Sequence, residues 1–206
     1  MQNRKPISLE DVEKAAELVK SHIHRTPLLR LSTAIVDMIR EVAAAAHPSQ
    51  ESPALDIRLK CENFQRVGAF KFRGATNAVS GTLSTNPDVK IVATHSSGNH
   101  GAALALAAKL SGIQSLIIVP DTAPPNKVEA IRGYNGNVVF SKPAEREETL
   151  ARVVAEKQTL LGQQAVEVIP PFNHPLVMAG QGTLALEVLE VRVVSSFDTN
   201  VEISPF

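Results

Sequence analysis

The chain has 206 residues, of which 44% are hydrophobic and 20% are charged, an ordinary composition for a globular protein. At roughly 100–200 residues per domain, this length allows one or two domains. The 21 basic and 21 acidic side chains cancel, so the charge balance argues against a nucleic acid or an acidic membrane surface as a partner. No apolar run is long enough to span a bilayer.

The N-terminal residues and the cysteine content indicate the compartment. Residues 1–13 carry several charges and lack the apolar core of a secretory signal, so we expect a cytoplasmic protein. Cys61 is the only cysteine and cannot form an intramolecular disulfide, which makes a reducing compartment the simplest inference. We interpret Cys61 as a small buried hydrophobic residue.

The first third of the chain is predicted to contain two helices and one strand. Apolar residues recur at helical spacing over residues 12–23, and Ser8 with Asp11 resembles a capping box before this helix. Pro27 ends the helix and begins a short extended segment. The other predicted elements are a helix over residues 32–46, a polar surface loop over residues 47–53 and a strand over residues 57–62.

Beyond residue 87, strands and helices alternate. The predicted strands cover residues 89–94, 115–119, 137–140 and 165–169. The predicted helices cover residues 102–110, 126–131, 145–161 and 174–190, the last with an interruption near Gly180 and Gly182. The strand at 115–119 has no polar face, as expected for a sheet that is covered on both sides. This alternation predicts a parallel α/β sheet with crossover helices.

Residues 68–75 read Gly-Ala-Phe-Lys-Phe-Arg-Gly-Ala, which places Lys71 between Phe70 and Phe72. A lysine in an apolar pocket loses solvation of its ammonium form, and its pKa can fall by up to ~3–5 units. Because a neutral amine attacks an aldehyde, Lys71 is a candidate for a cofactor-linked lysine. The alternative is a surface lysine on an amphipathic helix, with its stem along apolar neighbours. Residues 72–79, which follow Lys71, are predicted to be helical.

A second stretch, residues 94–101, reads Thr-His-Ser-Ser-Gly-Asn-His-Gly between a predicted strand and a predicted helix. A helix N-terminus offers unpaired N–H groups and a partial positive charge, and glycine lets a ligand approach the backbone. An anion or a polar cofactor group could therefore bind at this turn. The alternative is a well-capped turn of the kind that any α/β protein contains.

Together the two stretches resemble the fold-type II pyridoxal-phosphate enzymes, the tryptophan synthase beta-like family. Within this family the sequence is most similar to serine racemases and to threonine and serine dehydratases. Ser97 favours the racemases, because threonine dehydratases usually carry alanine at that position. The resemblance runs from about Ile7 to Glu190 and includes the motifs Asp11-Val12-Glu13-Lys14-Ala15, Thr26-Pro27, Lys60-Cys61-Glu62, Thr122-Ala123-Pro124 and Gly180-Gln181-Gly182-Thr183.

The resemblance implies an α/β fold of three layers, with parallel sheets and flanking helices. It implies a complete small domain over residues 80–167 and a partial large, cofactor-binding domain over residues 1–79 and 168–190. The family's glycine-rich loop for the cofactor phosphate is expected soon after Glu190. We find no such loop in residues 191–206, and we interpret the chain as C-terminally truncated with a divergent tail.

The resemblance also assigns roles to individual residues. Lys71 matches the lysine that carries pyridoxal 5'-phosphate as a Schiff base and moves a proton on one face of the substrate Cα. Ser97 matches the residue that handles the proton on the opposite face, so these two are the candidate catalytic residues. The residues matched to cofactor contacts are Phe70, Lys71, Asn99 and Asn173. The residues matched to substrate binding are Ser96, Ser97, Gly98, Asn99 and His100. No metal ligand is assigned.

These roles imply a pyridoxal-phosphate-dependent racemase or ammonia-lyase that acts on small hydroxy amino acids such as serine and threonine. The alternative is a non-catalytic, truncated fragment of such an enzyme. The resemblance implies a homodimer for the complete enzyme, and it places Lys127 and Tyr134 where animal serine racemases bind ATP. Ordinary surface residues explain those two positions equally well. A nicotinamide-binding domain is disfavoured because the Gly-x-Gly-x-x-Gly spacing is missing.

Overall fold

The structure is a computed structural model that describes residues 6–46, 55–96 and 98–195. The predicted surface loop at 47–53 and the candidate residue Ser97 lie outside the described residues.

The predicted alternation of strands and helices forms a four-stranded parallel sheet with the strand order β5-β4-β3-β6. Its strands are β3 (Ile91–His95), β4 (Gln114–Pro120), β5 (Asn137–Ser141) and β6 (Val166–Val168). The connecting helices are α4 (Asn99–Leu110), α5 (Pro125–Gly133) and α6 (Arg146–Leu161), and short 3₁₀ turns η3 (Pro143–Glu145) and η4 (Gln163–Ala165) flank α6. The parallel α/β fold expected from the sequence is confirmed.

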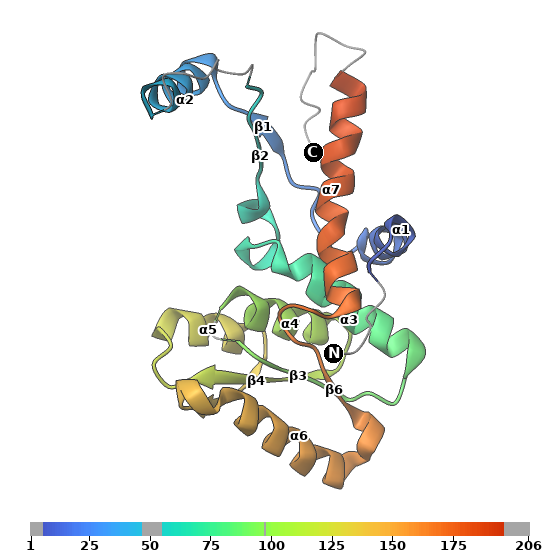
Figure 1. The fold of residues 1–206 in the computed structure, drawn as a ribbon. Coiled ribbons are helices and arrows are strands. Elements are labelled where there is room, and N and C mark those ends of the chain that lie inside the picture. The colour runs from blue at the N-terminus through green and yellow to red at the C-terminus, as the bar shows by residue number, and fades with distance from the viewer. Residues whose placement is uncertain (1–5, 47–54, 97, 196–206) are drawn as a thin grey trace.

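Helices cover both faces of this sheet, with α4 and α5 on one side and α6 on the other (Figure 1). The central strand β4 divides its apolar side chains between the two layers. Leu116 and Ile118 pack in the cluster with α6, whereas Ile117 and Val119 belong to the larger cluster with α4 and α5. Full burial of each large apolar side chain is worth about 1.5–3 kcal/mol, so an all-apolar strand is stable only where both faces are covered.

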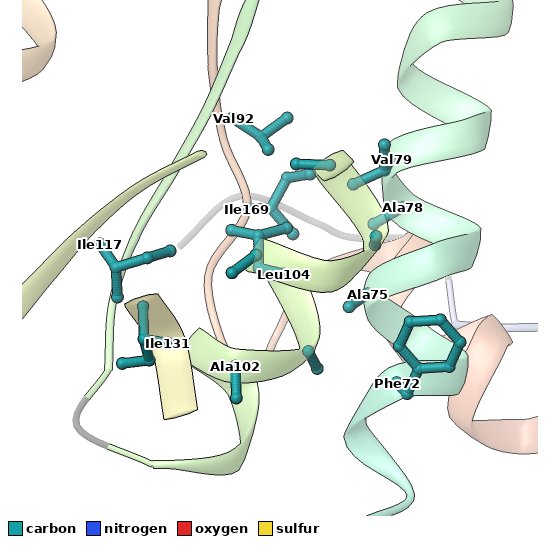
Figure 2. Close-up of a cluster of buried hydrophobic side chains, with 14 of the residues drawn as sticks. Phe72, Ala75, Ala78, Val79, Val92, Ala102, Leu104, Ile117, Ile131 and Ile169 are labelled. Carbon is teal, nitrogen blue, oxygen red and sulfur yellow. The ribbon is translucent and has the colours of Figure 1, made fainter. Parts of the chain in front are cut away.

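Helix α3 (Lys71–Thr85) adds a further layer against α4. Its packing face is made of small side chains and one phenylalanine, all fully buried: Phe72, Ala75, Ala78 and Val79. Figure 2 shows Ala75, Ala78 and Val79 facing Leu104 of α4 and Ile169, with Ile117 and Ile131 on the far side of the cluster. The small residues let α3 approach α4 closely, and this contact fixes where α3 begins relative to the sheet.

The remaining elements stand on the α3 side of the molecule (Figure 1). Helix α7 (Pro175–Ser195) packs against α3 and against α1 (Leu9–Val19). Strands β1 (Leu28–Arg30) and β2 (Arg58–Lys60) pair antiparallel, and α2 (Thr33–Ala46) lies at the far end of this ribbon. Two 3₁₀ turns, η1 (Glu62–Phe64) and η2 (Arg66–Gly68), connect β2 to α3.

The predicted start of α1 is confirmed in detail. The Ser8 hydroxyl accepts the Asp11 N–H at 3.2 Å, and the Asp11 carboxylate accepts the Ser8 N–H at 2.9 Å, which completes a capping box. Cys61 is a free, buried thiol, as the sequence predicted. Among the described residues, no helix is both long enough and apolar enough to cross a membrane.

The predicted interruption near Gly180 and Gly182 is wrong, because α7 runs through both positions. Both glycines face close neighbours instead of breaking the helix. A Cβ at Gly180 would lie 2.7 Å from the Cα of Gly74, and a Cβ at Gly182 would lie 2.8 Å from Val12. Helix α7 continues to Ser195, and the predicted domain boundary at residues 79–80 falls inside α3. The division into domains stays a prediction.

Candidate functional site

The strand order places a switch point at one edge of the sheet. Strands β3, β4 and β5 are added in one direction, whereas β6 lies on the opposite side of β3. In open α/β sheets, ligands bind outside the carboxyl ends of the strands where the order reverses in this way. The segments that leave β3 and β6 there are residues 96–101 and residues 169–174. The first is the Ser-Ser-Gly-Asn-His-Gly turn that the sequence singled out.

Lys71 reaches this edge from the first turn of α3. Its ammonium group donates a hydrogen bond to the Pro171 carbonyl oxygen at 2.8 Å, and Nζ lies 5.2 Å from the centre of the Phe70 ring. Burial lowers the pKa of the Lys71 amine. Phe72 points away into the core and is fully buried, so only one of the two flanking phenylalanines lies beside the amine. Lys71 is half-buried, which leaves its amine accessible to a ligand.

The turn at residues 96–101 presents the N-terminus of α4. The Ser96 hydroxyl accepts the N–H groups of Gly98 at 3.2 Å and Gly101 at 3.1 Å, which holds the turn closed. Gly98 is the N-cap residue and has no side chain of its own to cap the helix, and a Cβ at Gly98 would find open space within 4 Å. The first turn of α4 is therefore open to an anionic group of a ligand.

His100 is the most deeply buried polar group of the site, with a relative exposure of 2%. One ring nitrogen, Nε2, lies 3.1 Å from the Ile169 carbonyl oxygen; a carbonyl only accepts, so this nitrogen carries the proton. Burial, with a smaller contribution from the nearby Lys71 ammonium, lowers the pKa of the imidazole to about 4 despite the Ile169 carbonyl. The other ring nitrogen, Nδ1, is buried without a partner among the described residues. It is an acceptor of the kind that a bound ligand could satisfy.

The 169–174 segment links Lys71 to the turn. Its Ile169 and Pro171 carbonyl oxygens contact His100 and Lys71, two residues apart. Asn173 lies in the same segment with a φ of 57°, a left-handed conformation that asparagine tolerates better than most residues. The structure thus brings Lys71, His100 and the Asn173 segment together at one edge.

The remaining predicted site residues are more exposed than His100 or lie on another layer of the fold. Phe70 and Asn99 are exposed, at the start of α3 and the first position of α4. Lys127 is exposed on α5, and Tyr134, which follows that helix, packs partly against the main core cluster. Both belong to the α5 layer, and neither is placed against Lys71 by a described contact.

Sequence reasoning missed two features of this site. The Ile169 and Pro171 contacts are made by backbone carbonyls, which no side-chain pattern can reveal. The sequence reasoning also gave no role to Arg73, two residues after Lys71, although a fully buried arginine is rare and requires partners. The signal was present in the sequence, because Arg73 sits in a stretch otherwise made of small and apolar residues.

The chain is similar in sequence to known proteins. The sequence matches the family described as "Pyridoxal-phosphate dependent enzyme" over residues 19–201. It is 42% identical over 189 residues to serine racemase from Rattus norvegicus, which covers 89% of this chain and 50% of the relative. It is 43% identical over 183 residues to beta-hydroxyaspartate dehydratase from Paracoccus denitrificans, which covers 88% of this chain and 51% of the relative.

A solved structure extends the likeness to three dimensions. The fold superposes on maize serine racemase with a TM-score of 0.74 and 35% sequence identity, over 91% of this chain and 50% of that one. The chain spans about half the length of the curated relatives it matches. The family match also extends beyond Glu190, where the resemblance was expected to end. Since this match covers residues 19–201, the chain belongs to the pyridoxal-phosphate-dependent enzyme family.

Proposed function

We propose that this chain carries the catalytic lysine of a pyridoxal-phosphate-dependent serine racemase or serine–threonine dehydratase acting on small hydroxy amino acids. The observation that carries the proposal is the position of the Lys71 amine. It lies at the switch-point edge of the sheet, its pKa is lowered by burial, and it shares the 169–174 segment with His100. The similarity to serine racemases and a hydroxyaspartate dehydratase supports this substrate class.

The residues at this edge suit pyridoxal phosphate. A lysine with a lowered pKa supplies more neutral amine, the form that reacts with the cofactor aldehyde. The exposed Phe70 ring beside Nζ offers an apolar surface to an aromatic ring. The open N-terminus of α4 and the unpartnered Nδ1 of His100 offer polar groups to a substrate carboxylate or a cofactor oxygen.

When bound, pyridoxal phosphate supplies an electron sink for the charge left when the substrate Cα loses its proton. In our proposal Lys71 holds and returns that proton on one face of Cα, and Ser97 does so on the other. In the same proposal, Phe70, Asn99 and Asn173 each contact the bound cofactor. The backbone and side chains of residues 96–100 bind the substrate carboxylate. General acid–base transfer by such groups contributes roughly 10²–10⁴-fold in rate.

A second candidate is a non-catalytic piece of such an enzyme. The observation that favours it is the coverage, because the chain spans about half of each relative. In that case Lys71 keeps its lowered pKa and its reactivity toward the cofactor, while turnover needs protein that this chain does not supply. The two candidates therefore differ in whether the chain turns over substrate, while both predict that pyridoxal phosphate labels Lys71.

One experiment separates them. The purified chain is incubated with pyridoxal phosphate and L-serine, and D-serine and pyruvate are measured. A parallel sample without serine is reduced with borohydride, digested and examined by mass spectrometry for a label on Lys71. Label with turnover supports the enzyme, and label without turnover supports the non-catalytic piece. A label spread evenly over the lysines would refute both.

Three finer points belong to the same proposal. We propose that the complete enzyme is a cytoplasmic homodimer, as the family resemblance implies. We also propose ATP as a ligand near Lys127 and Tyr134, which share the α5 layer. Measurement of ATP affinity in the parent chain and in Lys127→Ala tests that site directly, and equal affinities would exclude it.

A further inference from the structure

A buried charge cluster lies directly behind Lys71, on the other side of the first turn of α3. Its centre is Arg73, whose side chain has no exposed surface. Two carboxylates grip the guanidinium. Glu62 accepts from Nε and Nη2 at 2.8 Å each, and Glu187 accepts from Nη1 at 2.6 Å and from Nη2 at 3.1 Å. Two carboxylates, each contacting two guanidinium nitrogens, hold a planar group in one orientation.

The charges of this cluster balance. Lys60 forms an ion pair with Glu187, so the cluster holds the positive groups Arg73 and Lys60 and the negative groups Glu62 and Glu187. Burial alone would raise the pKa of the Glu62 carboxyl, but hydrogen bonds from Arg73 and Thr26 outweigh it and the pKa is lowered. The Glu62 carboxylate therefore acts as a charged acceptor for Arg73.

The cluster joins segments that are far apart in the sequence. It connects β2 and η1, which precede α3, to α7, which lies more than a hundred residues later. The additional contacts to Arg73 come from the Thr183 hydroxyl at 3.2 Å and the His24 carbonyl at 3.4 Å. Next to it, the Gln181 side chain accepts the Gly74 N–H at 3.1 Å. The first turn of α3 is thus fixed to α7 by the ion pair between Arg73 and Glu187 and by the hydrogen bond from the Gly74 N–H to the Gln181 side chain.

Helix α7 also determines where the tip of Lys71 lies. Residues 169–174 lead directly into α7, and the Pro171 carbonyl of this segment accepts from Nζ. The Asn77 amide, two turns along α3, donates to the Leu176 carbonyl at 2.7 Å in the first turn of α7. Helix α7 therefore fixes both the position of the Lys71 backbone, through its contacts with α3, and the position of the Pro171 carbonyl that accepts from the Lys71 amine.

We propose that Arg73, gripped by Glu62 and Glu187, is a positioning residue that holds the Lys71 amine in its partly buried place beside Phe70 and Pro171. This inference rests on the proposed function of Lys71. A buried ion pair is often no more stabilising than apolar residues of similar volume, whereas an arginine–carboxylate pair with two hydrogen bonds adds geometric specificity. A displacement of about 1 Å at a reacting group can reduce a rate about 100-fold. Loss of the contacts between Arg73 and the two carboxylates would let the first turn of α3 move and expose the Lys71 amine.

The test compares three forms of the full chain. Lys60→Met combined with Glu187→Gln removes one charge of each sign and leaves Arg73 paired with Glu62. Glu190→Gln is the matched control, because Glu190 lies on the same helix and pairs with Arg25 at the surface. Each form is acetylated with limiting acetic anhydride across a pH series, and mass spectrometry gives the extent of reaction at Lys71. Lys109 on α4 serves as the internal reference.

The proposal predicts that the double variant reacts at Lys71 with a half-point at least about 0.5 pH unit higher than in the parent, because the exposed amine regains solvation. The Lys109 profile and the Glu190→Gln profile stay as in the parent. A double variant that melts cooperatively and keeps the parent profile at Lys71 overturns the proposal. If the double variant does not fold, Thr183→Val removes one hydroxyl contact and no charge. The same upward shift then supports the proposal, and an unchanged profile overturns it.

A second arm separates this inference from the proposed function. Labelling with pyridoxal phosphate and borohydride should fall on the order of tenfold or more in the double variant and not in Glu190→Gln. If the parent is not labelled but the acetylation half-point shifts, Arg73 positions Lys71 and the proposed function fails. If the parent is labelled but neither the acetylation profile nor the labelling rate changes in the variant, the function stands and the positioning role is refuted.

Discussion

At the scale of single residues, burial lowers the pKa of two groups at the switch-point edge. Lys71 and His100 are both contacted by carbonyls of the 169–174 segment, and burial lowers the pKa of each. For Lys71 this increases the share of neutral, nucleophilic amine near neutral pH. For His100 it keeps the imidazole neutral, so that Nδ1 remains an acceptor toward a ligand.

The Lys71 amine should react at a lower pH in the folded chain than in the unfolded chain. Burial disfavours the ammonium form, so the half-point of acetylation should lie below the ordinary lysine value of about 10.4. The measurement is the pH profile of Lys71 acetylation in buffer and in concentrated urea. Identical half-points under the two conditions would show that the fold does not alter this amine.

His100 should make the chain less stable as the pH falls from about 6.5 toward 4. The unfolded chain then binds a proton that the folded imidazole, with a pKa of about 4, does not take up. Between pH 7 and pH 5 this linkage removes about 2 kcal/mol from the free energy of unfolding. Urea melts at both pH values measure it in the parent and in His100→Gln. An equal pH dependence in the two proteins would assign the loss to other groups.

At the scale of elements, the crossing of α3 and α7 supports the site. The two helices touch at Gly74 and Gly180, where each backbone occupies the space that a side chain on the other would need. Close contact at this point brings Arg73 within reach of Glu187 and brings the start of α7 to Lys71 through the 169–174 segment.

Gly180→Ala should destabilise the chain by about 1–3 kcal/mol or more, the usual range for overpacking. The added Cβ would lie 2.7 Å from the Cα of Gly74 and 2.8 Å from the Arg73 carbonyl oxygen, and backbone atoms cannot move aside cheaply. Gly133→Ala is the matched control, because no atom lies within 4 Å of its Cβ at the end of α5. Urea denaturation measures both. A loss in Gly180→Ala no larger than in the control would contradict the close crossing.

The crossing also marks the limit of prediction from local pattern. The pattern of apolar residues along the chain located every strand of the parallel sheet and its helices to within a few residues. This was possible because a sheet that is buried on two faces needs apolar residues at regular local spacing. Gly180 and Gly182 were misread as an interruption, since local propensity penalises glycine in a helix while the partner helix requires it. Contacts such as Arg73 with Glu187 depend on residues more than a hundred positions apart, and no local pattern contains them.

At the scale of the whole molecule, the described residues differ in how well they are packed. The central strands β3 and β4 bury all of their large apolar side chains, with Val92, Ile117 and Ile118 fully inaccessible. Helix α2 instead exposes Met38 and Val42 by 64% and 68%. Lys71 on α3 and His100 on α4 lie on helices that pack against each other.

Amide hydrogen exchange should reflect this difference. Amides of β3 and β4 open only with global unfolding and should exchange slowest, whereas those of α2 and of the β1–β2 ribbon should exchange early. Mass spectrometry of peptides after timed exchange in the full chain measures this. Protection of α2 equal to that of β4 would contradict the packing described above.

The spectrum of the chain titrated with pyridoxal phosphate tests the central claim, that Lys71 is the reactive amine of the site. Titrations of the parent, Lys71→Ala and Lys109→Ala are compared after removal of excess cofactor. The account predicts a visible absorption band retained by the parent and by Lys109→Ala and lost in Lys71→Ala. A band of equal strength in all three, with Lys71→Ala still folded, would contradict it.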